Sequence, residues 1–180
     1  MKKVLNKEFF HRDCLDVAPD LVGKILCVRQ ADNSVRRVRI TESEAYRGEE
    51  DTACHAHKGR TSRTELLYGK SGIIYVYLCY GMHWLLNVIT GEEGHPQGVL
   101  FRAGGIPLDD SGVKKKLDGP AKLTKYLGIN KSHNGMTIYD NPDVWLEDDG
   151  ETFEIKTAKR VGIDYATEEY RNKQWRFCQR

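Results

Sequence analysis

The sequence contains no long hydrophobic run. Its apolar stretches are broken by Gly72, Gly81 and Asn87, and none approaches the ~20 residues that a membrane-spanning helix needs. The N-terminal segment MKKVLNKEFFHRD starts with two adjacent lysines but has no apolar stretch behind them, which is not the pattern of a signal peptide. We therefore expect a protein of the cytoplasm, or of the nucleoid within it, with no membrane partner.

Paired cysteines are also missing. The five cysteines are an odd number, and no two of them stand at CxxC spacing. We interpret them as reduced and mostly buried thiols, as is typical of intracellular proteins. The sequence likewise shows no phosphate-binding loop, dinucleotide-binding fingerprint, GxSxG motif or helix-hairpin-helix pattern.

The composition is that of a globular protein. Of the 180 residues, 39% are hydrophobic and 30% are charged, and the net charge is +2. This length allows one domain with a hydrophobic core. Because no repeat, low-complexity segment or linker divides the chain, we expect a single domain over residues 1–180, and a monomer.

The expected elements indicate an α+β fold. The expected helices are 14–23, 120–129 and 167–177, with a shorter one near 52–57. The expected strands are 24–30, 35–46, 73–82, 84–90, 99–105, 136–140, 144–149 and 152–163. Strands predominate without a βαβ rhythm, so we predict a single mixed α/β domain with a central antiparallel sheet and peripheral helices.

The segment TESEAY is the first candidate for chemistry. On a strand, Glu42, Glu44 and Tyr46 lie on one face, because side chains alternate with a period of two. An exposed strand end with solvated acids explains any single glutamate well. A carboxylate held beside an aromatic wall could instead have a pKa suited to activating water.

The segment TACHAHKGR places Cys54, His55 and His57 close together. A zinc site needs three or four ligands, and no second pair with the right spacing follows. A metal-dependent hydrolase built on these residues and Glu44 is thus a weaker hypothesis. A histidine here can also hydrogen-bond a ligand or stack on a flat ring.

The segment YVYLCYGMHWLLN is rich in aromatic rings. On a strand, Tyr75 and Tyr77 point to one side, whereas Gly81 favours a turn that places Tyr80 at a bend. A core position suits Tyr75 and Trp84. It suits Tyr80 less well, because a ring at a bend is more often exposed.

Basic residues gather at 36–39, 58–63 and 114–116. Stacking rings with basic surroundings fit a nucleic acid or a purine-like ligand. A nucleic-acid-binding domain without catalysis therefore remains an alternative to an enzyme. A carboxylate such as Glu44 would repel phosphates there unless it had a task of its own.

Taken together, the segments resemble one family. In their order along the chain they are ITESEAYRGEEDTACHAHKGRTSR, YVYLCYGMHWLLNV, GVLFRAGG, GPAKLTKYLGIN, AKRVGID and WRF. This order is similar to that in the alkyladenine (3-methyladenine) DNA glycosylases of the methylpurine-glycosylase type. The resemblance covers the chain from about Leu21 to Phe177. It implies a mixed α/β domain that binds double-stranded DNA containing damaged purines and uses no metal or organic cofactor.

The resemblance also implies a reaction and a catalytic pair. The family turns a damaged purine out of the duplex, hydrolyses its N-glycosidic bond and leaves an abasic site. Glu44 matches the carboxylate that activates water. Arg102 matches a cation that contacts the phosphate of the flipped nucleotide and helps to hold the water. No lysine stands in the pocket motifs, so we expect hydrolysis without a lyase step.

The remaining matches concern the pocket and the DNA. Tyr46, His55 and Tyr77 match the rings that enclose the flipped base. Asn87 matches the residue that disfavours the 2-amino group of guanine. Tyr80 matches the side chain inserted into the duplex, with Met82 beside it. The expected substrates are 3-methyladenine, 7-methylguanine, hypoxanthine and ethenoadenine.

Overall fold

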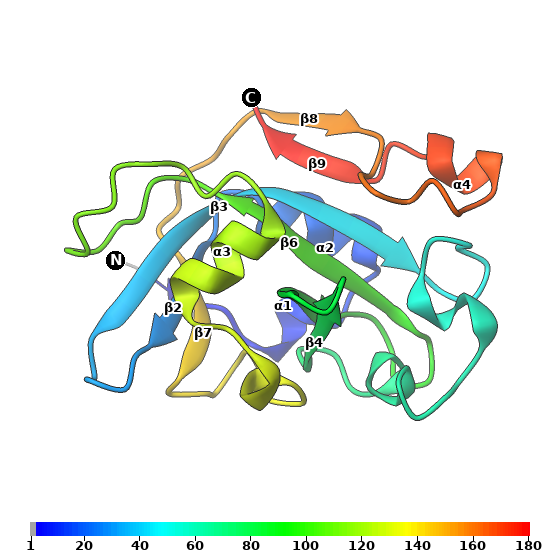
Figure 1. The fold of residues 1–180 in the computed structure, drawn as a ribbon, viewed down its shortest axis with the longest axis horizontal. Coiled ribbons are helices and arrows are strands. Elements are labelled where there is room, and N and C mark those ends of the chain that lie inside the picture. The colour runs from blue at the N-terminus through cyan, green and yellow to red at the C-terminus, as the bar shows by residue number, and fades with distance from the viewer. Residues whose placement is uncertain (1–2) are drawn as a thin grey trace.

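Strand β3 (Val35–Arg47) is the longest strand, and the fold is built around it. The computed structural model describes residues 3–180, whose nine strands form one sheet (Figure 1). Along the sheet the order is β1 (Lys3–Val4), β7 (Val144–Asp148), β2 (Ile25–Arg29), β3, β6 (Gln97–Gly104), β5 (His83–Ile89) and β4 (Ile74–Cys79). All the strand pairs are antiparallel. The predicted α+β fold with a central antiparallel sheet is therefore confirmed.

Two further strands attach to the edge of β3. The first part of this edge pairs with β2, and Glu42 to Glu44 then pair with β9 (Arg176–Gln179). Strand β9 in turn pairs with β8 (Ile155–Ala158). Strand β6 runs along the other edge of β3, with register shifts around Glu42. The middle of β3 thus has neighbours on both edges, which fixes the direction of its side chains.

The helices cover both faces of the sheet. Helices α1 (Lys7–Phe10) and α2 (Cys14–Leu21) lie on one face, and α3 (Pro120–Leu127) lies on the other (Figure 1). Ser43 on β3 donates a hydrogen bond of 2.6 Å to the Ala18 carbonyl of α2. Since side chains alternate along a strand, Glu44 and Tyr46 point toward the face that carries α3.

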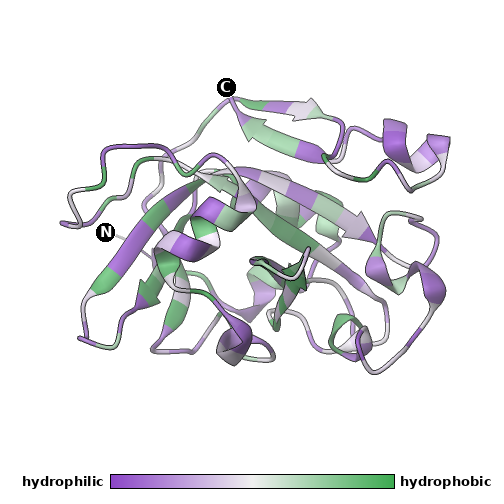
Figure 2. Ribbon diagram, viewed as in Figure 1, coloured by the Kyte–Doolittle hydropathy of each residue, from purple (hydrophilic) through white to green (hydrophobic). Residues whose placement is uncertain are grey.

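Helix α3 packs tightly onto the strands beneath it. Pro120 occupies its first turn, where a missing N–H costs nothing, and Gly128 ends it in the left-handed conformation. Leu123 and Leu127 are fully buried. Thr124 donates a hydrogen bond of 2.7 Å to the Trp84 carbonyl of β5. Figure 2 shows the hydrophobic residues concentrated on central strands such as β6, whereas the loops are largely hydrophilic.

The connections carry shorter elements. Two 3-10 turns, η1 (His55–Lys58) and η2 (Glu65–Tyr68), lie between β3 and β4. A third, η3 (Lys131–His133), follows α3, and α4 (Glu168–Asn172) precedes β9. The short helix expected near residues 52–57 corresponds to η1. No helix in residues 3–180 is long and apolar enough to cross a membrane.

Three expected elements are wrong in whole or in part. Residues 136–140 form no strand, because Thr137 makes only one bridge, to Ile73, and the chain turns at Asp140 with φ of +50°. The strand expected over 152–163 is only β8, since the chain bends at Val161 and Gly162, where Gly162 has a φ of +74°. The helix expected over 167–177 ends at Asn172, and the residues after it form β9 on the edge of β3.

Candidate active site

A cavity of about 280 Å³ lies over strands β3 to β6, between the start of α3 and the segments 53–55 and 161–165. Most of its wall is apolar or aromatic, with a few polar groups, as in most small-molecule sites. Seven of the eight predicted site residues line it, namely Glu44, Tyr46, His55, Tyr77, Tyr80, Asn87 and Arg102. The eighth, Met82, lies outside the cavity.

Glu44 is the buried acid of this cavity. Its Oε2 accepts a hydrogen bond of 2.8 Å from the Tyr46 hydroxyl, and its Oε1 accepts one of 3.0 Å from the Val161 amide. Burial raises the pKa of Glu44, while Arg102 and the two hydrogen bonds oppose the rise. The three contacts leave part of the lone-pair capacity of Oε2 open to a further donor such as water.

Arg102 supplies the cation beside this acid. It stands on β6, next to β3, and its Nε lies 3.1 Å from Oε1 of Glu44. This contact is an ion pair whose N–H is not aligned for a hydrogen bond. The side chain of Arg102 is only about 20% exposed, so water screens the attraction incompletely.

Aromatic rings form the walls. The rings of His55 and Tyr77 meet edge to face, with centroids 4.5 Å apart. The ring of Tyr75 lies 5.6 Å from that of Tyr77. Tyr75 is buried in a hydrophobic core cluster as expected, and it also lines the cavity.

His55 is held as a neutral ring. Its Nδ1 lies 3.0 Å from the Tyr75 hydroxyl, which also takes a hydrogen bond from Arg63. Burial lowers the pKa of His55 to about 4, with a smaller contribution from Arg63. If the Tyr75 hydroxyl donates to Nδ1, the proton of the neutral ring lies on Nε2, which can then donate to a ligand.

Asn87 stands on β5 at the floor of the cavity. It is buried, and its Nδ2 donates a hydrogen bond of 3.2 Å to the Tyr75 carbonyl. This bond fixes the side chain across the β4–β5 pair, so the amide forms a rigid part of the floor.

Tyr80 and Met82 occupy the tip of the β4–β5 hairpin. They are 85% and 70% exposed, which agrees with the bend predicted at Gly81. Tyr80 has a φ of +51°, a strained value for a residue with a large side chain.

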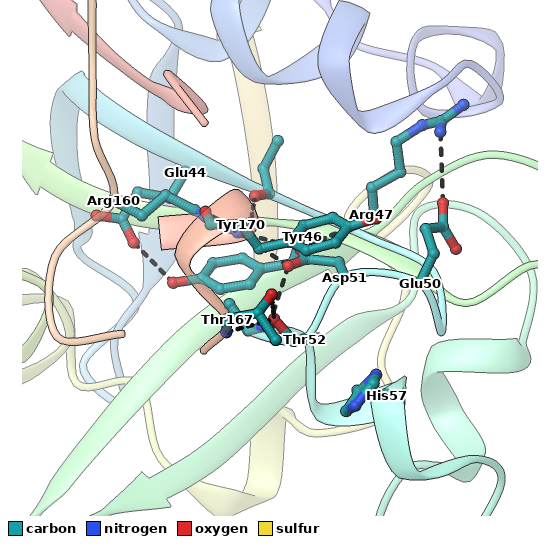
Figure 3. Close-up of polar contacts among 12 residues, drawn as sticks. Glu44, Tyr46, Arg47, Glu50, Asp51, Thr52, His57, Arg160, Thr167 and Tyr170 are labelled. Carbon is teal, nitrogen blue, oxygen red and sulfur yellow. Dashed lines mark hydrogen bonds and ion pairs between the residues drawn. The ribbon is translucent and has the colours of Figure 1, made fainter. Parts of the chain in front are cut away.

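A buried ion pair behind the cavity was not predicted from the sequence. Arg160 and Asp51 are fully buried and bonded through two nitrogen–oxygen contacts. Arg160 also stacks on Tyr46, with its Cζ 4.7 Å from the ring centroid. Figure 3 shows this pair next to Glu44 and Tyr46, with Tyr170 nearby. No local pattern reveals the pair, because 109 positions separate its members.

The residues of the metal hypothesis are not gathered into a metal site. His57 is exposed and its Nδ1 contacts the Glu49 carbonyl at 2.7 Å, away from Glu44. Burial raises the pKa of the Cys54 thiol to about 12, so this cysteine is not a thiolate. Within residues 3–180, no three Cys, His, Asp or Glu side chains come together as metal ligands.

The basic runs differ in their surroundings. In the run 36–39, Arg39 binds Asp149 and Glu151, Arg37 lies near Glu147, and Arg36 bonds the Tyr126 carbonyl. Lys58 and Arg63 are exposed on the segment that carries His55. In this second run Arg60 is paired with Glu65, whereas no ion pair is found for Lys58 or Arg63 among the described residues.

Comparison with known proteins identifies relatives along nearly the whole chain. The profile of the methylpurine-DNA glycosylase (MPG) family matches residues 8–180. A protein of Desulfitobacterium hafniense is 43% identical over 97% of this chain and 94% of its own length. One of Natranaerobius thermophilus is 42% identical, covering 96% and 93%, and one of Rickettsia felis is 40% identical, covering 97% and 92%. All three carry the provisional name 3-methyladenine DNA glycosylase.

Proposed function

The chain belongs to the methylpurine-DNA glycosylase family, and from this premise we propose that it excises alkylated and deaminated purines from double-stranded DNA. The damaged nucleotide turns out of the duplex into the cavity. Hydrolysis of its N-glycosidic bond then releases the base and leaves an abasic site. The observation that carries the proposal is the buried carboxylate of Glu44, set among rings in a cavity with an open mouth.

The chemistry follows from the contacts of Glu44. Breaking the bond between the sugar C1′ and the purine nitrogen sends the bonding electron pair to the base and builds positive charge on the sugar. A carboxylate beside C1′ stabilises that charge, as in glycosidases. The oxygen of a water molecule bonds to C1′, and its proton passes to Oε2 of Glu44. Arg102, next to Oε1, helps to hold the water and contacts the phosphate of the flipped nucleotide.

The nature of the lesion decides how much help the base needs. Methylation at N3 or N7 makes a purine cationic, so the electron pair leaves a neutral base behind. Tyr46 and Tyr77 then favour the electron-poor ring by stacking and cation–π attraction, on the order of 1–2 kcal/mol each. Neutral lesions such as hypoxanthine or ethenoadenine must gain a proton as they leave.

Other residues select and hold the nucleotide. His55 donates from its neutral ring to the edge of the base, and Asn87 on the rigid floor of the cavity excludes the 2-amino group of guanine. Flipping costs a few kcal/mol, least at a damaged pair. Tyr80 offsets part of this cost by filling the gap in the base stack, with Met82 beside it.

The same cavity supports a hydrolase without lyase activity. A lyase of this type attacks the sugar with an amine to form a Schiff base. Among the described residues that line the cavity there is no lysine. We propose that water is the sole nucleophile and that the protein works as a monomer.

The proposal is tested by incubation with duplexes that carry one hypoxanthine or one ethenoadenine, followed by hot alkali to break the abasic strand. Glu44→Gln is expected to lower the cleavage rate by at least about 100-fold and to leave duplex binding nearly intact, because the base catalyst is lost. Glu42→Gln is the matched control. Glu42 stands on the same face of β3, but it is paired with Arg176 and does not line the cavity.

Three other outcomes would favour a different function or a different catalytic group. Binding without cleavage of any lesion by the unaltered protein would favour the nucleic-acid-binding domain. Activity that EDTA removes would favour the metal-dependent hydrolase. Full activity of Glu44→Gln would show that another group activates the water.

A further inference from the structure

The guanidinium of Arg160 joins four segments of the chain behind the cavity wall. We propose that Arg160, held by Asp51, is a positioning residue for the reaction. It fixes the Tyr46 ring and the Val161 amide, which are the two hydrogen-bond donors on the carboxylate of Glu44. This inference rests on the proposed function and deepens it.

Arg160 itself has a fixed position. Its Nη1 donates to Oδ2 of Asp51 at 2.6 Å and its Nη2 donates to Oδ1 at 2.9 Å, a two-pronged contact (Figure 3). Nη1 also donates to the Ala45 carbonyl at 2.9 Å, and Nη2 to the Tyr170 carbonyl at 3.3 Å. A planar group with four such bonds cannot rotate without breaking several of them.

This fixed group is sandwiched between two rings. Its Cζ lies 4.7 Å from the centroid of Tyr46 and 5.1 Å from that of Trp175. The cation therefore holds the plane of the Tyr46 ring by cation–π attraction. Once that plane is set, the Tyr46 hydroxyl has its 2.8 Å bond to Oε2 of Glu44.

Arg160 also constrains the Val161 amide, which is the second hydrogen-bond donor to Glu44. Val161 follows Arg160 directly in the chain, and its N–H reaches Oε1 of Glu44 at 3.0 Å. The segment after β8 is not in the sheet at this point. The anchored side chain of Arg160, together with the bond from Arg176 to the Lys159 carbonyl, therefore constrains the direction of the Val161 amide.

Asp51 extends the network to the opposite wall. Its carboxylate accepts hydrogen bonds from the Arg47 amide at 3.1 Å and from the Ala53 amide at 3.0 Å. These bonds tie the end of β3 to the segment that leads to His55. The pair therefore orders both sides of the cavity.

Stability alone is a poor explanation for this pair. Burying two charges costs several kcal/mol each, and well-packed apolar residues of similar volume are often as stabilising. In addition, Nε of Arg160 is buried with no hydrogen-bond partner in the described part of the chain. The pair is buried in spite of these costs, and Arg160 contacts Tyr46 and precedes Val161, the two donors to Glu44. A role in fixing the geometry around Glu44 therefore explains the pair better than stability does.

The test compares Arg160→Lys with Arg39→Lys. Arg39 also makes a two-pronged contact with an aspartate, Asp149, and lies over a ring, Phe153, but it does not line the cavity. Single-turnover release of free 7-methylguanine from a duplex is measured over a pH series, together with the affinity for the duplex. That base leaves without protonation, and the pKa of His55 is lowered to about 4, whereas burial raises the pKa of Glu44. The first loss of activity as the pH falls, the acid limb of the profile, therefore reports the protonation of Glu44.

Arg160→Lys is expected to slow cleavage by at least about 10-fold with little change in affinity. The acid limb should also move to higher pH, because the two donors that lower the pKa of Glu44 are loosened. The other charged or titratable groups near Glu44 are kept in the variant; they are Arg102, Arg176, Tyr46, Tyr77 and Cys178. Arg39→Lys should change neither the rate nor the profile.

A double-mutant cycle separates positioning from general loosening. Tyr46→Phe removes one donor, so its effect and that of Arg160→Lys should be strongly non-additive. If Arg160→Lys fails to fold, Asp51→Asn decides the question, because it keeps Arg160 and the volume of Asp51 while weakening the two-pronged contact. Folding is checked by near-ultraviolet circular dichroism.

A folded variant with an unchanged pH profile and additive effects would overturn the positioning role while the proposed function stood. Lack of cleavage of every lesion by the unaltered protein would instead overturn the proposed function and this inference with it.

Discussion

Glu44 shows how its surroundings make one residue suited to a reaction. Its oxygens are buried, which raises the pKa, yet three donors or cations hold the charged form. A carboxylate that served only to line a DNA-binding surface would gain nothing from this arrangement. At the residue scale, burial combined with directed hydrogen bonds is the strongest structural support for catalysis.

A substitution at Tyr80 is expected to increase stability and to weaken DNA binding. Tyr80→Gly should raise the free energy of unfolding by about 0.5–1 kcal/mol, because glycine adopts the observed positive φ without strain. If Tyr80 is the wedge proposed above, the same change should weaken capture of a lesion-bearing duplex by about 10-fold, because nothing then fills the gap in the base stack. Urea unfolding and duplex titration measure the two effects.

Asn33→Gly is the control for Tyr80, because Asn33 also has a positive φ, +65°, at the β2–β3 turn. It should leave duplex capture unchanged. Equal losses of capture in the two variants would remove the special role of Tyr80.

At the scale of elements, Gly104 on β6 has no room for a side chain between Val38 of β3 and Leu123 of α3. A Cβ there would lie 2.3 Å from Cγ1 of Val38 and 3.1 Å from Cδ1 of Leu123. Gly104→Ala should therefore lower the free energy of unfolding by about 1–3 kcal/mol, as overpacking does. Chemical denaturation gives the value directly.

The next residue is a matched control. A Cβ at Gly105 would have its nearest neighbours at 3.7 and 3.8 Å, which are ordinary contacts. Gly105→Ala should change stability by less than about 0.5 kcal/mol. Similar losses for both variants would mean that crowding by Val38 and Leu123 is not the cause of the loss.

For the whole molecule, the small net charge of +2 makes its distribution decisive. Lys58 is exposed at the end of η1, the turn that carries His55. If it contacts a phosphate, Lys58→Ala should reduce the slope of log affinity against log salt by about 1. Fluorescence anisotropy at several salt concentrations measures this slope.

Lys7→Ala removes the same charge from α1, on the face of the sheet opposite α3. For Lys7→Ala, the slope of log affinity against log salt should match that of the unaltered protein. A fall of equal size would indicate that only total charge matters.

The features that could be predicted from the sequence are those that depend on residues close together along the chain. The period of two placed Glu44 and Tyr46 on one face, and Gly81 predicted the bend that exposes Tyr80. Most site residues followed from the resemblance to a family rather than from spacing. Their roles remain predictions, although seven of them line one cavity.

What escaped prediction depends on contacts between distant segments. Strand β9 forms because β3 has a free edge, not because residues 176–179 have a strong strand pattern. The residues next to Arg160 in the sequence do not predict its burial or its contacts, because these depend on Asp51 and Tyr46, which are distant in the sequence. Such pairings become visible only in the folded chain.

The distance along the chain between Asp51 and Arg160 has a consequence for synthesis. Protein chains are made from the N-terminus, so Glu44, Tyr46 and His55 are translated long before Arg160 is added. Until the segment 158–176 arrives, Glu44 lacks the Val161 amide and Tyr46 lacks the cation behind its ring. The nascent chain on the ribosome thus carries Glu44, the proposed catalytic carboxylate, for many codons before the contacts that orient it can form.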